Sequence, residues 1–285
     1  MYLPHCLNRA LFTLCLLFLA PLSANAAPVA LITDVQGRAT LVTAARSADA
    51  TILADIEAGT QLQLQANSKL VVLYLADGSE YLLQGPAQVV FRAERPEVTS
   101  GAPAVRRAAP TGAGTRINPA GLGQGAIVMR SLGSLRIRLL NASGTLLLDA
   151  QPELRWAAPE AGLRYSIDIA DDTGRSLHQA QVDGSSFTVP ASLQLRAGVA
   201  YGWEVSARAS DGRRYSGRGE FGIAGAPLRA QAEAVHGQAG GAVSDQVALA
   251  LWLEQQELRD EARKLWRALA IQRSQEPQIR AMAER

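Results

Sequence analysis

The chain has 285 residues, of which 48% are hydrophobic and 19% are charged, and its formal net charge is +2 at pH 7. This length is sufficient for two domains that each bury a core of their own. The net charge is too small to predict nucleic-acid binding or strong adhesion to an anionic membrane surface.

The first 26 residues predict a cleaved export signal. Arg9 precedes an apolar run over residues 10–20, and Ala24-Asn25-Ala26 fits the small-x-small cleavage rule. The apolar run is much shorter than the roughly 20 residues that span a bilayer. We therefore expect cleavage after Ala26, a periplasmic protein, and no transmembrane segment in the mature chain; an uncleaved anchor is the alternative.

Cysteine and histidine positions argue against a metal centre. Both cysteines, Cys6 and Cys15, lie in the export signal, so the mature chain is expected to hold no disulfide and no thiolate metal site. The histidines left, His178 and His236, lack the close spacing of a zinc motif. No nucleophile elbow, phosphate-binding glycine loop or dinucleotide fingerprint is present. The sequence therefore predicts no catalytic residue, no metal and no cofactor.

Residues 27–100 predict a small β domain. Strands are expected at 29–33, 39–43, 61–65 and 87–92. Residues 69–84 predict a hairpin, because Asp77-Gly78 tolerates the positive φ angles of a tight turn. The unbroken apolar run over residues 70–75 predicts a strand that is buried on both faces.

Several stretches of this region match a family pattern, namely Gly37, Ala58-Gly59-Thr60-Gln61-Leu62, Ser68-Lys69-Leu70-Val71-Val72-Leu73, Asp77-Gly78-Ser79 and Gly85-Pro86-Ala87. Through them the region resembles the FecR-like periplasmic β domain, which implies an all-β extracytoplasmic module. In the founding group this module belongs to a regulator that passes an outer-membrane signal to a cytoplasmic sigma factor. Here neither a cytoplasmic segment nor a membrane helix precedes the β region, which argues against direct sigma-factor control.

Residues 101–128 predict a linker, because glycine, alanine and proline dominate them. Three arginines lie within it, at positions 106, 107 and 116. They are interpreted as solvated linker charges, with contact to an anionic envelope polymer as the alternative.

Residues 129–225 predict a β-sandwich. Strands with alternating large apolar and polar residues need a second apolar layer over their apolar face. We expect Trp156 and Trp203 in the core between the layers. The alternation is clearest at Tyr165, Ile167 and Ile169, and again at Tyr201, Trp203 and Val205.

Positions along this region match a family pattern, namely Pro152, Leu154 and Trp156 early, Tyr165 and Ile167 in the centre, and Leu195, Gly198, Tyr201, Trp203, Val205, Ala207 and Phe221 late. Through them the region resembles a fibronectin type III-like domain, which implies a fold and not a ligand.

Five arginines of this region predict a basic surface if the strands that carry them are neighbours. An ordinary solvated strand face is the alternative interpretation. The five are Arg136, Arg138, Arg213, Arg214 and Arg218.

Residues 226–243 predict a second linker, and residues 244–285 predict a helical hairpin. Ser244 is expected to cap a helix over 245–256, followed by a turn near Glu257 and a helix over 259–272. One long helix is the alternative. A further helix is expected at 276–284.

The helical pair resembles one tetratricopeptide-like repeat, through Leu249, Ala250, Leu253, Ala262 and Trp266. A single pair of helices cannot bury its own apolar face. It must dock on a β domain, self-associate or hold a separate partner. The predicted partner face comprises Leu249, Leu253, Leu265 and Trp266.

The sequence thus predicts a mainly β protein, with two small β modules and a C-terminal α-helical hairpin. We expect an exported, non-catalytic binding or scaffolding protein of the periplasm, with an envelope sensing assembly as one setting. The expected partner is another envelope protein, or a second copy through the C-terminal helices. The alternatives are a module that binds peptidoglycan or another glycan, and a hydrolase with an unrecognised carboxylate pair.

Overall fold

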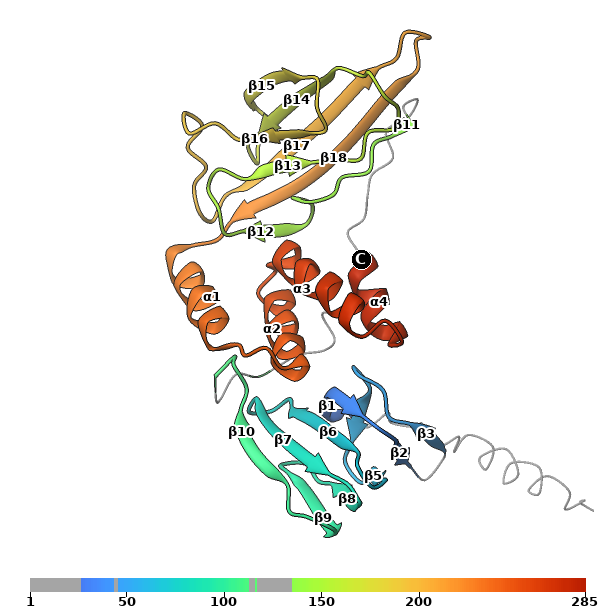
Figure 1. Cartoon of the computed structure of the whole chain (residues 1–285). Helices are drawn as coiled ribbons and strands as arrows, with labels where there is room; N and C mark the ends of the chain where they lie inside the picture. Colours follow the sequence, from blue (N-terminus) through green and yellow to red (C-terminus); the bar gives the residue numbers. More distant parts are fainter. Residues whose placement is uncertain (1–26, 44–45, 113–115, 117–134) are drawn as a thin grey trace, which may run out of the picture.

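The computed structural model describes residues 27–43, 46–112, 116 and 135–285. The predicted signal peptide lies outside the described residues, as does most of the predicted first linker. The described chain is mainly β, with two β modules and a layer of helices between them (Figure 1). The fold class expected from the sequence is confirmed.

The first β module consists of two five-stranded antiparallel sheets that face one another. Their strand orders are β10-β7-β6-β1-β4 and β3-β2-β5-β8-β9. Apolar side chains from both sheets, such as Val72 and Phe91, meet in one buried core. The strands are β1 (Pro28–Gln36), β2 (Ala39–Val42), β3 (Ser47–Asp49), β4 (Asp55–Glu57), β5 (Gln61–Leu64), β6 (Lys69–Tyr74), β7 (Ser79–Gln84), β8 (Ala87–Phe91), β9 (Pro96–Ser100) and β10 (Val105–Ala108).

The hairpin predicted at residues 69–84 is confirmed. β6 and β7 pair antiparallel from Lys69 opposite Gln84 to Leu73 opposite Glu80. Gly78 in the turn has a φ of 66°, a value that glycine adopts at little cost. The prediction that residues 70–75 are buried on both faces is also confirmed. Leu70 and Val72 belong to the sandwich core, whereas Leu73 faces the helices.

The predicted first linker was wrong at its start. Residues 105–108 form β10, which pairs antiparallel with β7 at the edge of the sheet. The four side chains of β10 are all exposed, so no burial pattern in the sequence marked it as a strand. Its residues have no alternation of apolar and polar side chains because none of its side chains enters the core.

The second β module has one large sheet, ordered β11-β18-β17-β14-β15, with β12 also paired to β18. A two-stranded sheet of β13 and β16 lies over its apolar face. Trp156 and Trp203 are each 1% exposed in the core between them, as predicted. The strands are β11 (Leu135–Arg136), β12 (Thr145–Leu147), β13 (Glu153–Arg155), β14 (Tyr165–Ala170), β15 (Ser176–Val182), β16 (Ser186–Thr188), β17 (Ala200–Arg208) and β18 (Arg214–Ile223).

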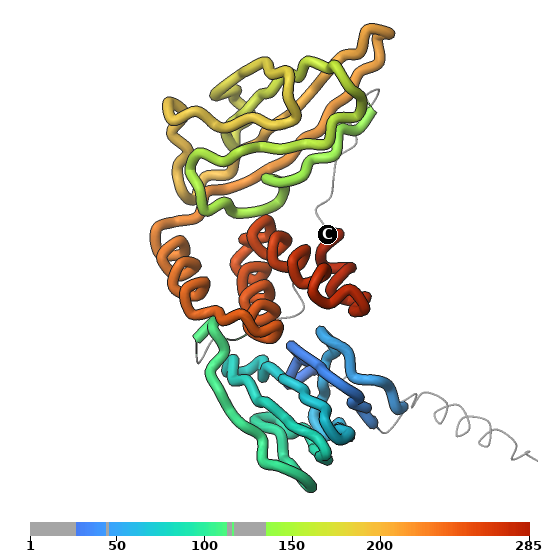
Figure 2. Tube along the Cα trace, viewed as in Figure 1, coloured from blue at the N-terminus to red at the C-terminus, as the bar shows by residue number. Residues whose placement is uncertain are grey.

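Four helices form the layer between the two β modules (Figure 2). They are α1 (Ala226–Gln238), α2 (Val243–Gln255), α3 (Arg259–Gln272) and α4 (Pro277–Glu284). The break predicted near Glu257 is confirmed, and Glu257 has a φ of 60° there. The predicted second linker was wrong, because residues 226–238 form α1. Pro227 suits the first turn of a helix, and three alanines among the next residues favour its continuation.

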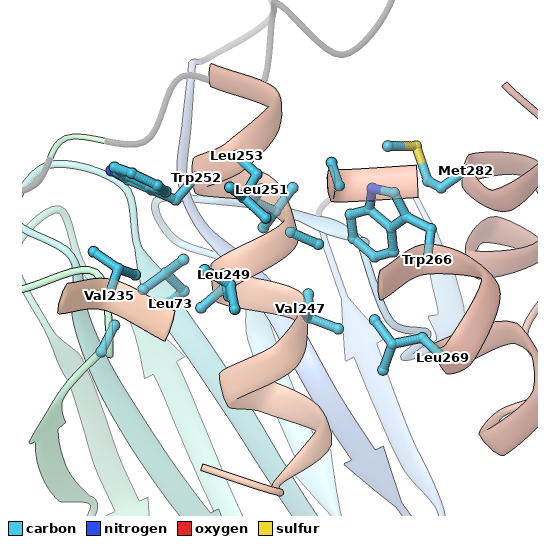
Figure 3. Close-up of a cluster of buried hydrophobic side chains, with 14 of the residues drawn as sticks. Leu73, Val235, Val247, Leu249, Leu251, Trp252, Leu253, Trp266, Leu269 and Met282 are labelled. Carbon is cyan, nitrogen blue, oxygen red and sulfur yellow. The ribbon is translucent and has the colours of Figure 1, made fainter. Parts of the chain in front are cut away.

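Helix α2 is apolar on nearly all sides and is buried accordingly. Residues 247–253 are all buried, which is expected of a helix without a solvent face. In Figure 3, Leu249 of α2 lies beside Leu73 of β6, while Trp266 of α3 lies on the other side of α2. The helix is therefore covered by the first module on one side and by α3 on the other.

Candidate functional site

The most polar contact between the first β module and the helices surrounds Arg107. Its Nε lies 2.7 Å from Oε2 of Glu80. Its Nη2 donates hydrogen bonds to Ser244 Oγ at 2.5 Å and to Asp245 Oδ1 at 2.8 Å. Arg107 comes from the edge strand β10, and the two acceptors come from the first turn of α2. One guanidinium thus ties the edge of the sheet to the start of the helix.

The sequence prediction for this cluster was wrong in two respects. Arg107 is not a solvated linker charge, because it pairs with a carboxylate on each side of the junction. Ser244 is not the N-cap, because α2 begins at Val243 and Ala242 precedes it. The Ser244 hydroxyl accepts a hydrogen bond from Arg107 of the first β module. This bond takes the place of the one that an N-cap side chain would accept from the backbone of its own helix.

Glu80 is a buried acid whose pKa is raised to about 7. Its side chain is 0% exposed, and removal from water is the largest cause of the shift. Arg107 lowers the pKa and nearby Asp245 raises it, so the ion pair only partly offsets burial. Glu80 is enclosed between sheet and helix, where its proton affinity is coupled to folding.

Two further contacts fix the other side of the first module to the helices. Asp34 of β1 accepts a hydrogen bond from Arg273 Nη2, at the end of α3, at 2.8 Å. Gln278 of α4 donates to Thr51 Oγ1 at 3.1 Å. The two partners in each pair lie more than 200 positions apart in the sequence, so these contacts exist only in the folded chain.

The junction between the second β module and the helices centres on Asp260. Its Oδ2 accepts a hydrogen bond from the backbone N–H of Ala142 at 2.7 Å, and its Oδ1 accepts one from Arg263 at 2.6 Å. Asp260 is 7% exposed. The backbone N–H of Leu146 in β12 also donates to the carbonyl of Glu257 at 2.8 Å. The second module is therefore hydrogen-bonded directly to the turn between α2 and α3.

This second junction continues into the core of the β-sandwich through Ala142. Its φ of 52° is unusual for a residue other than glycine and costs free energy. The carbonyl of Ala142 accepts a hydrogen bond from the Trp203 indole at 2.7 Å, while its N–H donates to Asp260. Gly219 makes room for this contact, since a Cβ there would lie 2.8 Å from the indole nitrogen. Asp260 of α3 and Trp203 of the sandwich core thus both hold the strained turn at Ala142.

The predicted partner face of the helices is covered by this chain. Leu249, Leu253 and Trp266 are between 0% and 2% exposed, and Leu265 packs against the same cluster. The prediction that these four residues form a surface for a partner was wrong in this structure. Of the three alternatives for the helical pair, the structure shows docking, and the cover comes from the first β module and the neighbouring helices.

The predicted basic surface is formed in part. β11 and β18 are neighbours, with Arg136 opposite Ser216, so the condition for a shared face is met. Arg213, however, pairs with Asp211 and Glu160. Arg218 pairs with Glu204. Arg138 is exposed beyond the end of β11. Two of the five predicted arginines are therefore neutralised by carboxylates.

The sequence analysis missed Arg208, which belongs to this surface. Arg208 ends β17 and lies directly opposite Arg214 of β18. Both are exposed, and neither they nor Arg136 forms an ion pair among the described residues. Like charges directly opposite one another in a sheet are destabilising. We call Arg136, Arg208 and Arg214 the arginine patch. Arg208 could have been located from the sequence, because antiparallel pairing across the Asp211-Gly212 turn places it opposite Arg214.

The described part of the chain holds no group of three or more histidine, cysteine or acidic residues that could bind a metal ion. His178 stacks on Phe187 with ring centroids 5.6 Å apart, and His236 lies on α1. No helix among the described residues is long and apolar enough to cross a membrane.

No family model matches the chain, and no curated protein matches it significantly. Among solved structures, the chain is similar to CopC from Methylosinus trichosporium OB3b, with 24% identity over 31% of this chain and 93% of that one, at a TM-score of 0.24. It is also similar to a tetra-tandem repeat of a large adhesion protein, with 13% identity, 70% and 42% coverage, and a TM-score of 0.22.

A third similar structure is a β-D-glucuronidase of Dictyoglomus thermophilum, with 9% identity, coverage of 69% of this chain and 33% of that one, and a TM-score of 0.22. The chain spans less than half of this protein and of the adhesion repeat.

Proposed function

We propose that this protein is an exported, non-catalytic scaffold of the periplasm that holds two β modules at a fixed spacing. The export signal predicted over residues 1–26 supports the location. The resemblances to FecR-like, fibronectin type III-like and tetratricopeptide-like modules support a role in binding, with an envelope sensing assembly as one setting.

The observation that carries the proposal is the double attachment of the helical layer. Its apolar cluster includes Leu31 and Leu73 of the first module and receives Leu146 and Leu148 of the second. Modules joined only by linkers are expected to move relative to one another. Here apolar contact, Arg107 and Asp260 oppose such motion, which suits a part that sets the distance between two binding surfaces.

The proposal is tested by measuring the distance between the modules. The chain after residue 26 has no cysteine, so spin labels at Gln63→Cys and Ser210→Cys report one distance without further changes. A single narrow distance distribution is expected. It should broaden when Asp260→Ala is added, and should not change with Glu261→Ala, which alters the neighbouring half-buried residue whose ion pair is with Lys264 of the same helix. A broad distribution in the unaltered protein would contradict a fixed spacing.

The hydrolase alternative gains no support from the raised pKa of Glu80. A carboxylate pair that acts on a substrate must be reachable from solvent, and the Glu80 side chain is 0% exposed. Its pKa is explained by burial at a junction that has a structural purpose.

A second candidate function, the binding of an anionic glycan, is favoured by the arginine patch. Three exposed guanidinium groups on one sheet face, which form no ion pair with any described carboxylate, suit a polymer that carries carboxylates. Retention on purified sacculi tests this candidate. The double variant Arg208→Glu with Arg214→Glu should no longer be retained on the sacculi. The control Arg229→Glu with Arg280→Glu, on exposed helix positions, makes the same change in charge and should still be retained. Equal loss in both would indicate non-specific attraction.

A further inference from the structure

Strand β15 differs from the other strands at sheet edges in the described part of the chain. It is bonded only to β14 and forms one end of the large sheet. It has seven residues, whereas β3, β4, β9, β10 and β11 have between two and five. A long open edge presents a row of backbone donors and acceptors that another strand can pair with.

Protection against such pairing is also missing from β15. Proteins commonly place charged side chains or proline on their edge strands. Asp49, Asp55, Glu97, Arg106 and Arg136 supply a charge to β3, β4, β9, β10 and β11. The edge strands β12 and β16 carry no charge either, but each has only three residues. The sequence of β15, Ser-Leu-His-Gln-Ala-Gln-Val, has no lysine, arginine, acid or proline. β15 therefore has a long unpaired backbone edge and no charged residue or proline that would block pairing.

The charges that flank β15 make the strand complementary to itself. Arg175 precedes it and Asp183 follows it, with side chains 76% and 77% exposed; within the chain Arg175 pairs with Asp171 and Asp183 pairs with Arg164, so the interface would exchange or share these partners. In an antiparallel pair of two copies centred on Gln179, each Arg175 lies opposite Asp183 of the other copy. Parallel pairing in register would place arginine against arginine, which is unfavourable. The charge pattern thus selects the arrangement with two-fold symmetry.

The same register keeps core-side residues on the core side. His178, Ala180 and Val182 pair with Ile169, Ile167 and Tyr165, which point into the sandwich core. Pairing centred on Gln179 sets His178 of one copy opposite Ala180 of the other, so both remain on that face. Gln179 itself is exposed on the outer face and meets its own counterpart at the symmetry axis.

We propose that two copies of this chain associate through antiparallel pairing of their β15 strands, which joins their large sheets into one. This interface is remote from the helical layer and does not depend on the proposed scaffold function. It replaces the expected self-association through the helices, whose apolar residues are buried. It would place two helical layers and two arginine patches in one symmetric particle.

Light scattering and sedimentation of the purified chain over a concentration series test the proposal. The expected result is a mass that rises to twice that of the single chain. Gln179→Lys and Gln179→Glu should each remain single chains, because each places two like charges opposite one another at the axis. An equimolar mixture of the two variants should recover the doubled mass.

A matched control is Gln88→Lys, which makes the same change on an exposed position of β8 in the first module and should leave association unchanged. Circular dichroism of the Gln179 variants separates loss of pairing from loss of fold. The proposal is overturned if the unaltered chain stays single at every concentration. It is also overturned if both folded Gln179 variants associate as well as the unaltered chain does.

Discussion

Strands β6 and β17 lie near the centre of their sheets but bury their side chains in different ways. In β6, five consecutive residues are buried after Lys69. In β17, every second residue is buried, and Glu204 and Ser206 between them reach solvent. The first strand has a second sheet on one face and helices on the other, whereas the second has a layer on one face only. A continuous apolar run therefore indicated a docking surface for the helices, 150 residues before they occur in the chain.

The largest expected effect comes from weakening the second covered face of β6. Leu73→Ala removes a fully buried side chain from the contact with α2 and leaves a cavity. Substitutions of this kind cost about 2–5 kcal/mol of unfolding free energy. Glu204→Ala, at an outward position of β17, should cost less than about 1 kcal/mol, since it removes only a surface ion pair. Denaturant-induced unfolding monitored by tryptophan fluorescence measures both changes. Similar losses would contradict the one-sided burial of β17.

The pH dependence of stability should report the burial of Glu80, the residue opposite Leu73. Its pKa of about 7 in the folded chain is above the usual value of 4.5. Between these values the folded state binds more protons than the unfolded state, so the unfolding free energy falls as pH rises from about 4.5 to about 7. The contribution from this group amounts to roughly 3 kcal/mol, and it is fully present at the acidic end of the window.

Glu80→Gln should remove that slope, because the amide does not titrate in this range. The exposed Glu153→Gln is the control and should leave the slope in place. Aspartates with lowered pKa, such as Asp77, act in the opposite direction, but at lower pH. Thermal unfolding measured at intervals from pH 5 to pH 7.5 tests the prediction, which an unchanged slope in Glu80→Gln would refute.

The junction with the second module should respond less strongly. Asp260→Ala leaves the N–H of Ala142 and the guanidinium of Arg263 without an acceptor that they share in the folded chain. The expected cost is about 1–3 kcal/mol. Hydrogen exchange of the Ala142 amide should accelerate in this variant and stay slow in Glu261→Ala. If the amide exchanges equally fast in both variants, Asp260 does not hold the turn.

The smallest expected effect distinguishes two arginines on the uncovered face of the second module. Arg218→Ala removes an exposed ion pair with Glu204 and should cost about 0.2–1 kcal/mol. Arg214→Ala removes a repulsion with Arg208 and should be neutral or stabilising by a similar amount. Unfolding midpoints at low salt, where surface charges are least screened, resolve the difference in sign. Equal destabilisation by the two variants would show that the repulsion is not felt.

The parts of the fold that were predicted from sequence are those in which side chains carry the pattern. The β6–β7 hairpin, the two core tryptophans and the break near Glu257 each left a local signal. Strand β10 left none, because all four of its side chains are exposed and none alternates into the core. Helix α1 was hidden by its content of glycine and alanine, which resembles that of a linker.

The candidate site was predicted less well, because it depends on pairing between distant segments. The neighbouring positions of Arg136 and Arg214 follow from the order of strands in the sheet, and Arg208 follows from the register of one hairpin. Whether an arginine has a carboxylate partner depends on the fold in the same way. Arg107 is the clearest case, since its partners Glu80 and Asp245 lie 27 and 138 positions away.

The first module depends on residues that are synthesised much later, as the pairing of Asp34 with Arg273 illustrates, and this has a consequence for how the protein is made. A ribosome completes the first module long before it reaches α2. The apolar side chains of Leu31 and Leu73 therefore stay exposed to water while the following residues are synthesised. The helices that cover them begin only at residue 226. A product that stops early would therefore expose the apolar face of this sheet without the helices that cover it. Such a product would be a natural target for chaperones and proteases.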